Sequence, residues 1–179
     1  MNDGHIVVGI GGGIAAYKAA EVVSRLVQQG MSVRVVMTHS AQKFVGAATF
    51  AALTSHPVAT SSFSSAYPLG AHIDLADRCR LLLIAPATAR LIGCCAHGLA
   101  DSLLTTLYLN CQCPVIMAPA MSAPMWEKKP VQRNIELLRG DGVEIVGPGE
   151  GWLSCRKIGK GRMAEPADIL SAISIKLAN

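Results

Sequence analysis

The stretch HIVVGIGGGIAAYKAAEVVSRLVQQGMSVRVVMT (residues 5–38) decides the fold. It begins with an apolar strand pattern that runs into glycines, and the segment after them repeats apolar residues at helical spacing as far as Gly30, a typical helix-ending residue. Residues 32–38 form a second apolar strand pattern. A strand, a helix and a strand in this order form a right-handed crossover, so the sequence predicts two parallel strands.

The same alternation continues along the chain. Further strand patterns cover 81–87, 114–120 and 142–147, and helical patterns cover 88–98, the region around 131–139, and 166–178. Continuous apolar strands that alternate with helices favour an α/β fold with a parallel sheet covered on both faces, in a single domain. Two segments rich in Ser, Pro and Gly, 54–72 and 147–166, are expected to be irregular and exposed.

The composition predicts subunit contacts. Of the 179 residues 51% are hydrophobic and 16% are charged, whereas average globular chains carry about a quarter charged residues. The longest apolar runs, such as 81–89, reach about half of the ~20 residues that a membrane-spanning helix needs. We therefore expect a homo-oligomer and no membrane partner.

Other partners and sites are disfavoured. A net charge of +4 with 4% aromatic residues argues against a nucleic-acid partner. The first ten residues lack the pattern of a signal peptide, so we expect a cytoplasmic protein with reduced thiols. The cysteines contain no Cys-x-x-Cys pair and no histidine spacing typical of zinc, so no metal site is expected. They lie at positions 79, 94, 95, 111, 113 and 155.

The predicted strand ends carry unusual loops. Ligands of open parallel sheets bind beyond the carboxyl ends of the strands. The glycines at 11–13 let the backbone approach an anion at a helix start, and Thr38 and Ser40 offer hydroxyl groups at the next strand end. No third glycine stands at the spacing of a dinucleotide fingerprint, and no acidic residue ends the second strand. The pattern favours a mononucleotide phosphate.

Six motifs in order along nearly the whole chain together resemble one family, the FMN-dependent cysteine decarboxylases. This family comprises phosphopantothenoylcysteine decarboxylase and the enzymes that oxidatively decarboxylate C-terminal peptide cysteines. The motifs are GGGIAAYK (11–18), HIDL (72–75), PATA (86–89), AHGLADSLLTT (96–106), PAMSAPMW (119–126) and SCRKIGKGRMAEP (154–166).

The resemblance implies a flavoprotein domain over residues 1–179. Its expected fold is a Rossmann-like or flavodoxin-like doubly wound sheet, and its expected assembly is a homotrimer or a trimer-based dodecamer with FMN at the subunit contacts. The loop at 115–130 would be the lid and wall of the substrate pocket, with Ser122 and Met125 at the substrate. The implied FMN contacts are Gly12, Gly13, Ile14, Thr38, Ser40, Thr88, Ala89, Arg90 and Met121.

The resemblance also implies a reaction and two catalytic residues. His72 would be the base that manages the thiol proton of a cysteine-bearing substrate. Hydride then passes from the β-carbon to the flavin, and the resulting thioaldehyde releases the carboxylate as CO₂. In the coenzyme A branch a flap cysteine, here Cys155, protonates the enethiol intermediate before the flavin reduces it. Phosphopantothenoylcysteine is the leading substrate and 4'-phosphopantetheine the product.

Two positions depart from the family pattern. The family usually carries asparagines where this chain has Arg90 and Ser122, and the second asparagine is expected to hold the substrate carboxylate. A hydrogen bond to a charged group contributes about 1.5–3 kcal/mol. The alternatives are therefore an oxidative decarboxylase of a peptide C-terminal cysteine, a flavin-binding regulatory homologue without turnover, and a flavin prenyltransferase.

Overall fold

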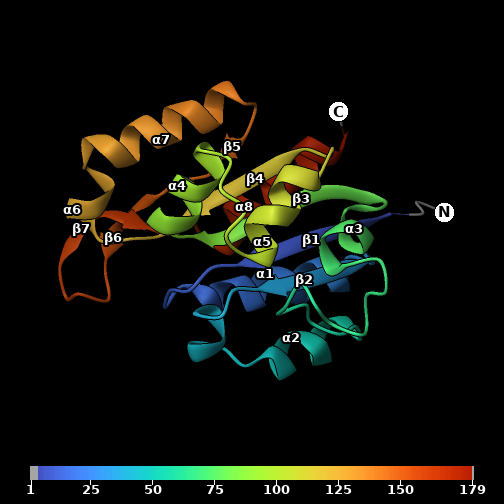
Figure 1. The fold of residues 1–179 in the computed structure, drawn as a ribbon. Coiled ribbons are helices and arrows are strands. Elements are labelled where there is room, and N and C mark those ends of the chain that lie inside the picture. The colour runs from blue at the N-terminus through green and yellow to red at the C-terminus, as the bar shows by residue number, and fades with distance from the viewer. Residues whose placement is uncertain (1–3, 179) are drawn as a thin grey trace.

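The computed structural model describes residues 4–178, which form one α/β domain around a five-stranded parallel sheet (Figure 1). The strand order is β2-β1-β3-β4-β5. The strands are β1 (His5–Ile10), β2 (Val33–Met37), β3 (Cys79–Ala87), β4 (Val115–Pro119) and β5 (Glu144–Ile145). The predicted doubly wound parallel sheet is confirmed, because helices cover both of its faces.

The helices expected after the first, third and fourth strands and at the chain end are all present as α1, α4, α7 and α8. Helices α2, α3, α5 and α6, which the periodicity did not predict, are mostly short. The bounds are α1 (Ala16–Gln28), α2 (Ala47–Thr54), α3 (Ala71–Ala76), α4 (Ala89–Ala96), α5 (Leu103–Asn110), α6 (Ala123–Trp126), α7 (Lys129–Gly140) and α8 (Pro166–Ala178), with a 3-10 turn at Ala41–Lys43.

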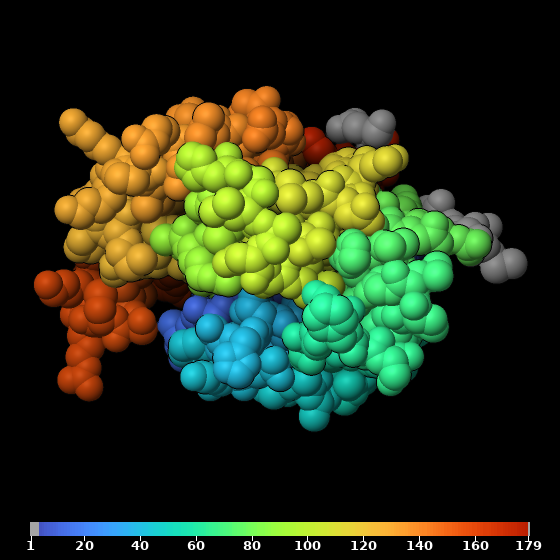
Figure 2. All heavy atoms as spheres, in the orientation of Figure 1, coloured from blue at the N-terminus to red at the C-terminus, as the bar shows by residue number. Residues whose placement is uncertain are grey.

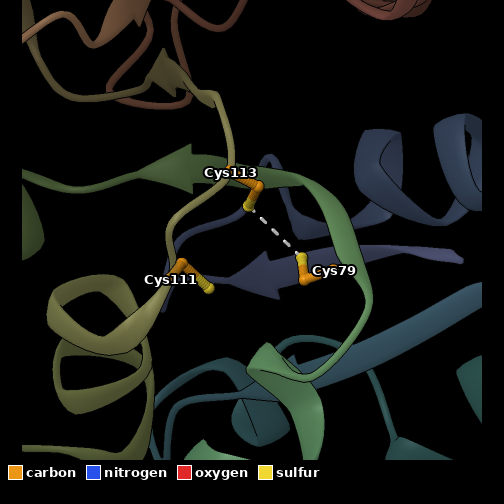
Figure 3. A group of neighbouring side chains, drawn as sticks. All are labelled: Cys79, Cys111 and Cys113. Carbon is orange, nitrogen blue, oxygen red and sulfur yellow. Dashed lines mark hydrogen bonds between the residues drawn. The ribbon is translucent and has the colours of Figure 1, made fainter.

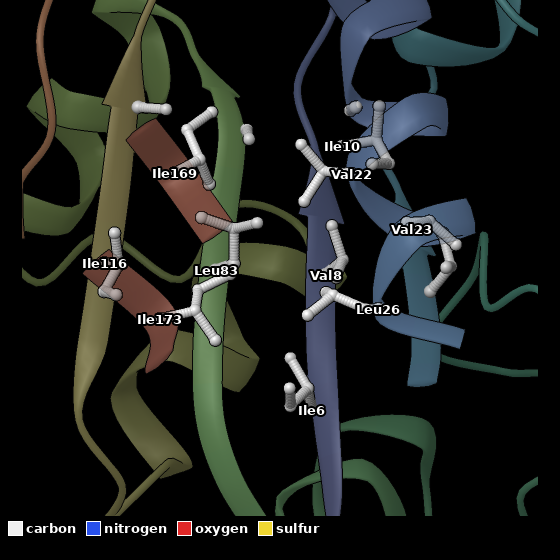
Figure 4. Close-up of a cluster of buried hydrophobic side chains, with 14 of the residues drawn as sticks. Ile6, Val8, Ile10, Val22, Val23, Leu26, Leu83, Ile116, Ile169 and Ile173 are labelled. Atoms are coloured by element: carbon white, nitrogen blue, oxygen red, sulfur yellow. The ribbon is translucent and has the colours of Figure 1, made fainter. Parts of the chain in front are cut away.

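One face of the sheet packs against α1, α2 and α8. Side chains of a strand alternate between the two faces, so β1 contributes Ile6, Val8 and Ile10 to this layer (Figure 4). Leu83 of β3 lies among them and is fully buried. This layer fixes α1, and with it the glycine-rich turn, against the sheet.

The opposite face packs against α3, α4, α5 and α7. Val7 points to this side, where Leu104 of α5 and Leu138 of α7 are also buried. Gly9 of β1 leaves room for α5, since a Cβ on Gly9 would lie 2.3 Å from Leu104 Cδ1. None of the helices among residues 4–178 combines the length and the apolar character needed to cross a bilayer.

The segment 147–166 is not irregular as expected. It contains an antiparallel hairpin, β6 (Gly149–Trp152) and β7 (Ile158–Arg162). The alternation of glycine with charged residues concealed these strands, because glycine and lysine are depleted in strands and no apolar face marks them. The hairpin projects from the body of the molecule beside the strand ends (Figures 1 and 2).

The hairpin lies directly on the loop after β4. Met121 N–H donates to the carbonyl of Gly161 at 3.0 Å. A Cβ on Gly161 would lie 2.3 Å from the Met121 carbonyl oxygen, and one on Gly159 would lie 2.8 Å from Ala123 Cβ. Glycine is therefore required at 161 for this backbone contact.

An ion pair ties α1 to the segment before α8. Lys18 is buried, and its Nζ lies 2.9 Å from Glu165 Oε1 and 3.4 Å from the carbonyl oxygen of Met163. Arg162 contacts the same Glu165 oxygen at 3.0 Å. This pair joins the glycine-rich turn to the end of the hairpin.

Replacing Gly161 by alanine should separate the hairpin from the loop. The added methyl group meets backbone at φ +150°, so we expect a loss of about 1–3 kcal/mol in the free energy of unfolding. The free energy of unfolding of the variant and of wild type is measured by urea denaturation. Gly140→Ala is the control, because a Cβ there meets nothing within 4 Å and alanine favours a helix. Equal midpoints for the two variants would contradict the close contact.

The Lys18–Glu165 pair should make stability depend on pH. The hydrogen bond from Lys18 lowers the pKa of Glu165 below its ordinary value of 4.5. A carboxylate whose pKa is lower in the folded chain than in the unfolded chain stabilises the fold fully at pH values above its unfolded pKa. This contribution is lost as the pH falls through the pKa of the folded state. The gap in urea midpoint between wild type and Glu165→Gln should thus be full at about pH 7 and close as the pH falls below about 4.5. A gap that does not change with pH would contradict this role.

Candidate active site

A pocket of about 450 Å³ opens at the carboxyl edge of the sheet. Three elements line it: the turn into α1, the loop after β4, and the β6–β7 hairpin. Ligands of open parallel sheets bind at this edge. The structure brings five of the predicted site residues to the pocket, namely Gly13, Ile14, Met121, Ser122 and Cys155.

The residues of the predicted phosphate cradle lie just after β1 and β2, beside this pocket. Gly12 lies so close to the next strand end that a Cβ on it would be 2.3 Å from Ser40 Cβ. The Thr38 hydroxyl donates to the carbonyl of Ile10 at 3.3 Å and accepts from Ala41 N–H at 3.3 Å. These bonds hold the β2 end against the β1 end.

The cradle fits the phosphate of FMN. A Cβ on Gly13 would find only Pro86 Cγ, at 3.9 Å, so the backbone there faces open space. The first turn of α1, as described, contains no acidic side chain, and a helix start favours negative charge. Glycine backbone, two hydroxyl-bearing residues and a helix start form a suitable donor set for an anion.

The end of β3 supplies the other predicted flavin contacts. Thr88 caps α4, and its side chain accepts a hydrogen bond from Leu91 N–H at 3.4 Å. Ala89 is the first residue of α4. Thr88 and Ala89 lie next to the loop after β4, since Ala120 N–H donates to the Ala87 carbonyl at 3.1 Å.

Arg90 is engaged elsewhere. Its Nη2 lies 2.8 Å from Asp101 Oδ2, and Asp101 Oδ1 in turn accepts from the Thr105 hydroxyl at 3.1 Å. This pair is partly exposed and fixes the guanidinium at the start of α5. Arg90, one of the implied FMN contacts, is thus paired with Asp101 in this chain.

The loop after β4 divides into a pocket wall and a core anchor. Met121 and Ser122 line the pocket, and Ser122 stands before α6 without capping it through its side chain, among the described residues. Its hydroxyl remains for a ligand. Trp126 is buried in the second core layer, so it anchors the loop rather than lining the pocket. Met125 is 47% exposed and lies outside the pocket lining.

Cys155 lies at the exposed turn of the hairpin and lines the pocket. The turn is closed by a hydrogen bond of 2.9 Å from Leu153 N–H to the Lys157 carbonyl. By contrast, burial raises the pKa of Cys95 to about 12, which suits an inert core thiol. Cys155 is thus the thiol that a pocket ligand can reach.

His72 is remote from the pocket within one chain. It lies in α3. The carbonyl of Leu75, in the same helix, accepts a hydrogen bond of 3.0 Å from the side chain of His5 at the start of β1. Asn110 at the end of α5 donates to the His72 carbonyl at 3.2 Å. This is the amino edge of the sheet, opposite the hairpin (Figure 1). The Nδ1 atom of His72 is buried and has no hydrogen-bond partner among residues 4–178.

Lys18 and Trp152 also line the pocket, and sequence reasoning missed both. Lys18 stands within the GGGIAAYK motif. The sequence did carry a signal for it, because Lys18 stands four residues before Val22 and eight before Leu26, on the buried side of α1. A lysine on the apolar side of a helix indicates a buried charge with a partner, here Glu165.

Comparison with known proteins bears on this site. The Flavoprotein family profile matches residues 1–178. The coenzyme A biosynthesis bifunctional protein CoaBC of Bacillus subtilis is 45% identical over 171 residues, which are 95% of this chain and 42% of that protein. CoaBC of Haemophilus influenzae is 40% identical, over 97% of this chain and 44% of its own length. The chain thus spans less than half the length of these relatives.

Solved structures agree over the whole fold. SpaF, an FMN-dependent cysteine decarboxylase, superposes with a TM-score of 0.86 at 32% identity and covers 99% of this chain and 97% of its own. A variant of PPC decarboxylase complexed with pantothenoylaminoethenethiol gives a TM-score of 0.87 at 26% identity over 98% and 99% of the two chains.

The family profile and the structural neighbours agree with the motifs that meet at the strand ends. The resemblance to the FMN-dependent cysteine decarboxylases is confirmed, and the chain belongs to the flavoprotein family.

Proposed function

We propose that this chain is an FMN-dependent decarboxylase of a cysteine-derived carboxylate, with phosphopantothenoylcysteine as substrate and 4'-phosphopantetheine as product. The observation that carries the proposal is the pocket in which Cys155, Ser122 and the turn at Gly13 meet beside a phosphate cradle. The CoaBC relatives support the substrate through their names, which place them in coenzyme A biosynthesis.

Bound in the cradle, FMN supplies a group that accepts a hydride and returns it, so the overall reaction exchanges a carboxylate for a proton and releases CO₂. The chain's own residues bind and move protons. The Ser122 hydroxyl donates to the substrate carboxylate and takes the place of the family asparagine. The loop at Met121 and the hairpin cover the reacting carbons and limit the access of water.

Cys155 is the proposed acid on the hairpin. Its thiol protonates the carbon of the enethiol that decarboxylation leaves. The structural neighbour that binds pantothenoylaminoethenethiol, itself an enethiol, supports a pocket of this kind.

His72 is the proposed base and reaches the substrate from a neighbouring copy. Within one chain it stands at the opposite edge of the sheet from Cys155, so a site that contains both needs a second subunit. Large apolar side chains on the surface support such contacts, with Phe63 97% and Leu69 71% exposed just before α3. We propose a homotrimer, or a dodecamer built from trimers, in the cytoplasm, with residues 1–179 acting as one flavoprotein domain.

A second candidate substrate is a peptide with a C-terminal cysteine. The similarity to SpaF and the two replaced asparagines favour it. In that case Cys155 does not need to protonate the enethiol, because the peptide enethiol is itself released as the oxidised product. A regulatory flavoprotein without turnover is a further alternative.

The assay offers the purified protein phosphopantothenoylcysteine and follows CO₂ and product by mass spectrometry. Wild type should form 4'-phosphopantetheine, and His72→Asn should lower kcat by about 10²–10⁴-fold through loss of the base. His97→Asn is the matched control, since His97 is exposed, directly follows α4 and contacts Asn134. A wild-type protein that keeps its flavin but turns over neither this substrate nor a peptide would contradict the proposal.

Cys155→Ser separates the two substrate classes. If the hairpin thiol protonates the intermediate, this variant should still release CO₂ but accumulate the enethiol or its oxidised product instead of 4'-phosphopantetheine. Ser154→Ala, one residue away on the same turn, should leave the product unchanged. Normal product from Cys155→Ser would exclude the assigned role of this thiol.

A further inference from the structure

Three cysteines far apart in the sequence meet at the amino edge of the sheet. Cys79 is the first residue of β3, Cys111 directly follows α5, and Cys113 lies two residues before β4. Figure 3 shows the three side chains pointing toward one another. The Sγ atoms of Cys113 and Cys79 are 3.4 Å apart, and all three sulfur atoms lie within 4.8 Å of one another.

These separations suit a metal–thiolate centre. A zinc–sulfur bond of about 2.3 Å places two sulfur ligands roughly 3.8 Å apart in a tetrahedral site and roughly 4.0 Å apart in a trigonal one. Both values are larger than the 3.4 Å between the sulfur atoms of Cys113 and Cys79 and smaller than the 4.8 Å within which all three sulfur atoms lie. Small side-chain rotations are enough to reach either geometry.

The backbone holds the three positions in place. Cys111 N–H donates to the Leu107 carbonyl at 2.9 Å, which fixes it to the last turn of α5. The segment with Cys113 is attached to β3 through a hydrogen bond of 3.0 Å from Leu82 N–H to the Pro114 carbonyl. Because the scaffold brings the ligands together in advance, little ordering is needed when an ion binds.

The cluster is reachable from the surface. All three thiols are only partly buried. A cavity of about 240 Å³, lined by Cys111, Cys113 and Asp141, leads to it from the surface.

We propose that Cys79, Cys111 and Cys113 bind one thiophilic d¹⁰ cation of the zinc class per chain, with a solvent molecule as fourth ligand on the cavity side. Thiolates select such ions over hard cations like Mg²⁺. The ion joins the start of β3, the end of α5 and the segment before β4. This site is separate from the strand-tip pocket, because it lies at the other end of the same strands.

Zinc binding to the reduced, chelator-treated full chain tests the site. Titration with Zn²⁺ against a chromophoric chelator should give one ion per chain, and Cys113→Ser should bind it at least about tenfold more weakly, since even the loss of a group that only supports a ligand costs 10–100-fold. Cys94→Ser, another partly buried thiol outside the cluster, should bind like wild type. Mg²⁺ should not compete.

A second measurement uses only the wild-type protein, so it tests the site even if the Cys113→Ser variant fails to fold. Alkylation followed by peptide mass spectrometry should show that Zn²⁺ protects Cys79, Cys111 and Cys113 and leaves the hairpin thiol Cys155 reactive. The proposal is overturned if Zn²⁺ protects none of the three, if Cys113→Ser binds like wild type, or if the three thiols form a disulfide and the reduced protein takes up no zinc.

Discussion

Backbone segments at the carboxyl edge of the sheet approach one another more closely than a side chain would allow, and the candidate active site depends on this contact. Gly12 lies against Ser40, and Gly161 lies against the Met121 carbonyl. The first contact joins the ends of β1 and β2 into an anion cradle, and the second places the hairpin over the loop after β4. The buried Lys18, held by Glu165, links the two.

The two edges of the sheet carry different chemistry. The carboxyl edge has the cradle, the pocket and Cys155, while the amino edge has His72 and the three-cysteine cluster. Because the six residues of β1, at about 3.3 Å each, put roughly 20 Å between the two edges, a base at one edge cannot serve a pocket at the other within one chain. The proton transfer proposed for His72 therefore requires a second copy of the chain, and the exposed apolar residues before α3 support the proposed assembly.

The sequence predicted the sheet and its crossovers because continuous apolar strands and a glycine-terminated helix leave few other folds. It also located the pocket residues at Gly13, Met121 and Ser122, since loops after parallel strands must meet. It did not reveal the hairpin, whose glycines and lysines carry no apolar alternation. Nor did it reveal the cysteine cluster, because Cys79 joins Cys111 and Cys113 only through the pairing of β3 with β4.

The central claim is that the strand ends bind FMN through its phosphate. Fluorescence titration of the flavin-free protein with FMN and with riboflavin tests this most directly, because the two ligands differ only in that group. The account predicts one FMN per chain and binding of riboflavin weaker by about tenfold or more, as expected when charge-assisted hydrogen bonds are lost. Equal affinity for the two flavins, or no binding of either, would contradict it.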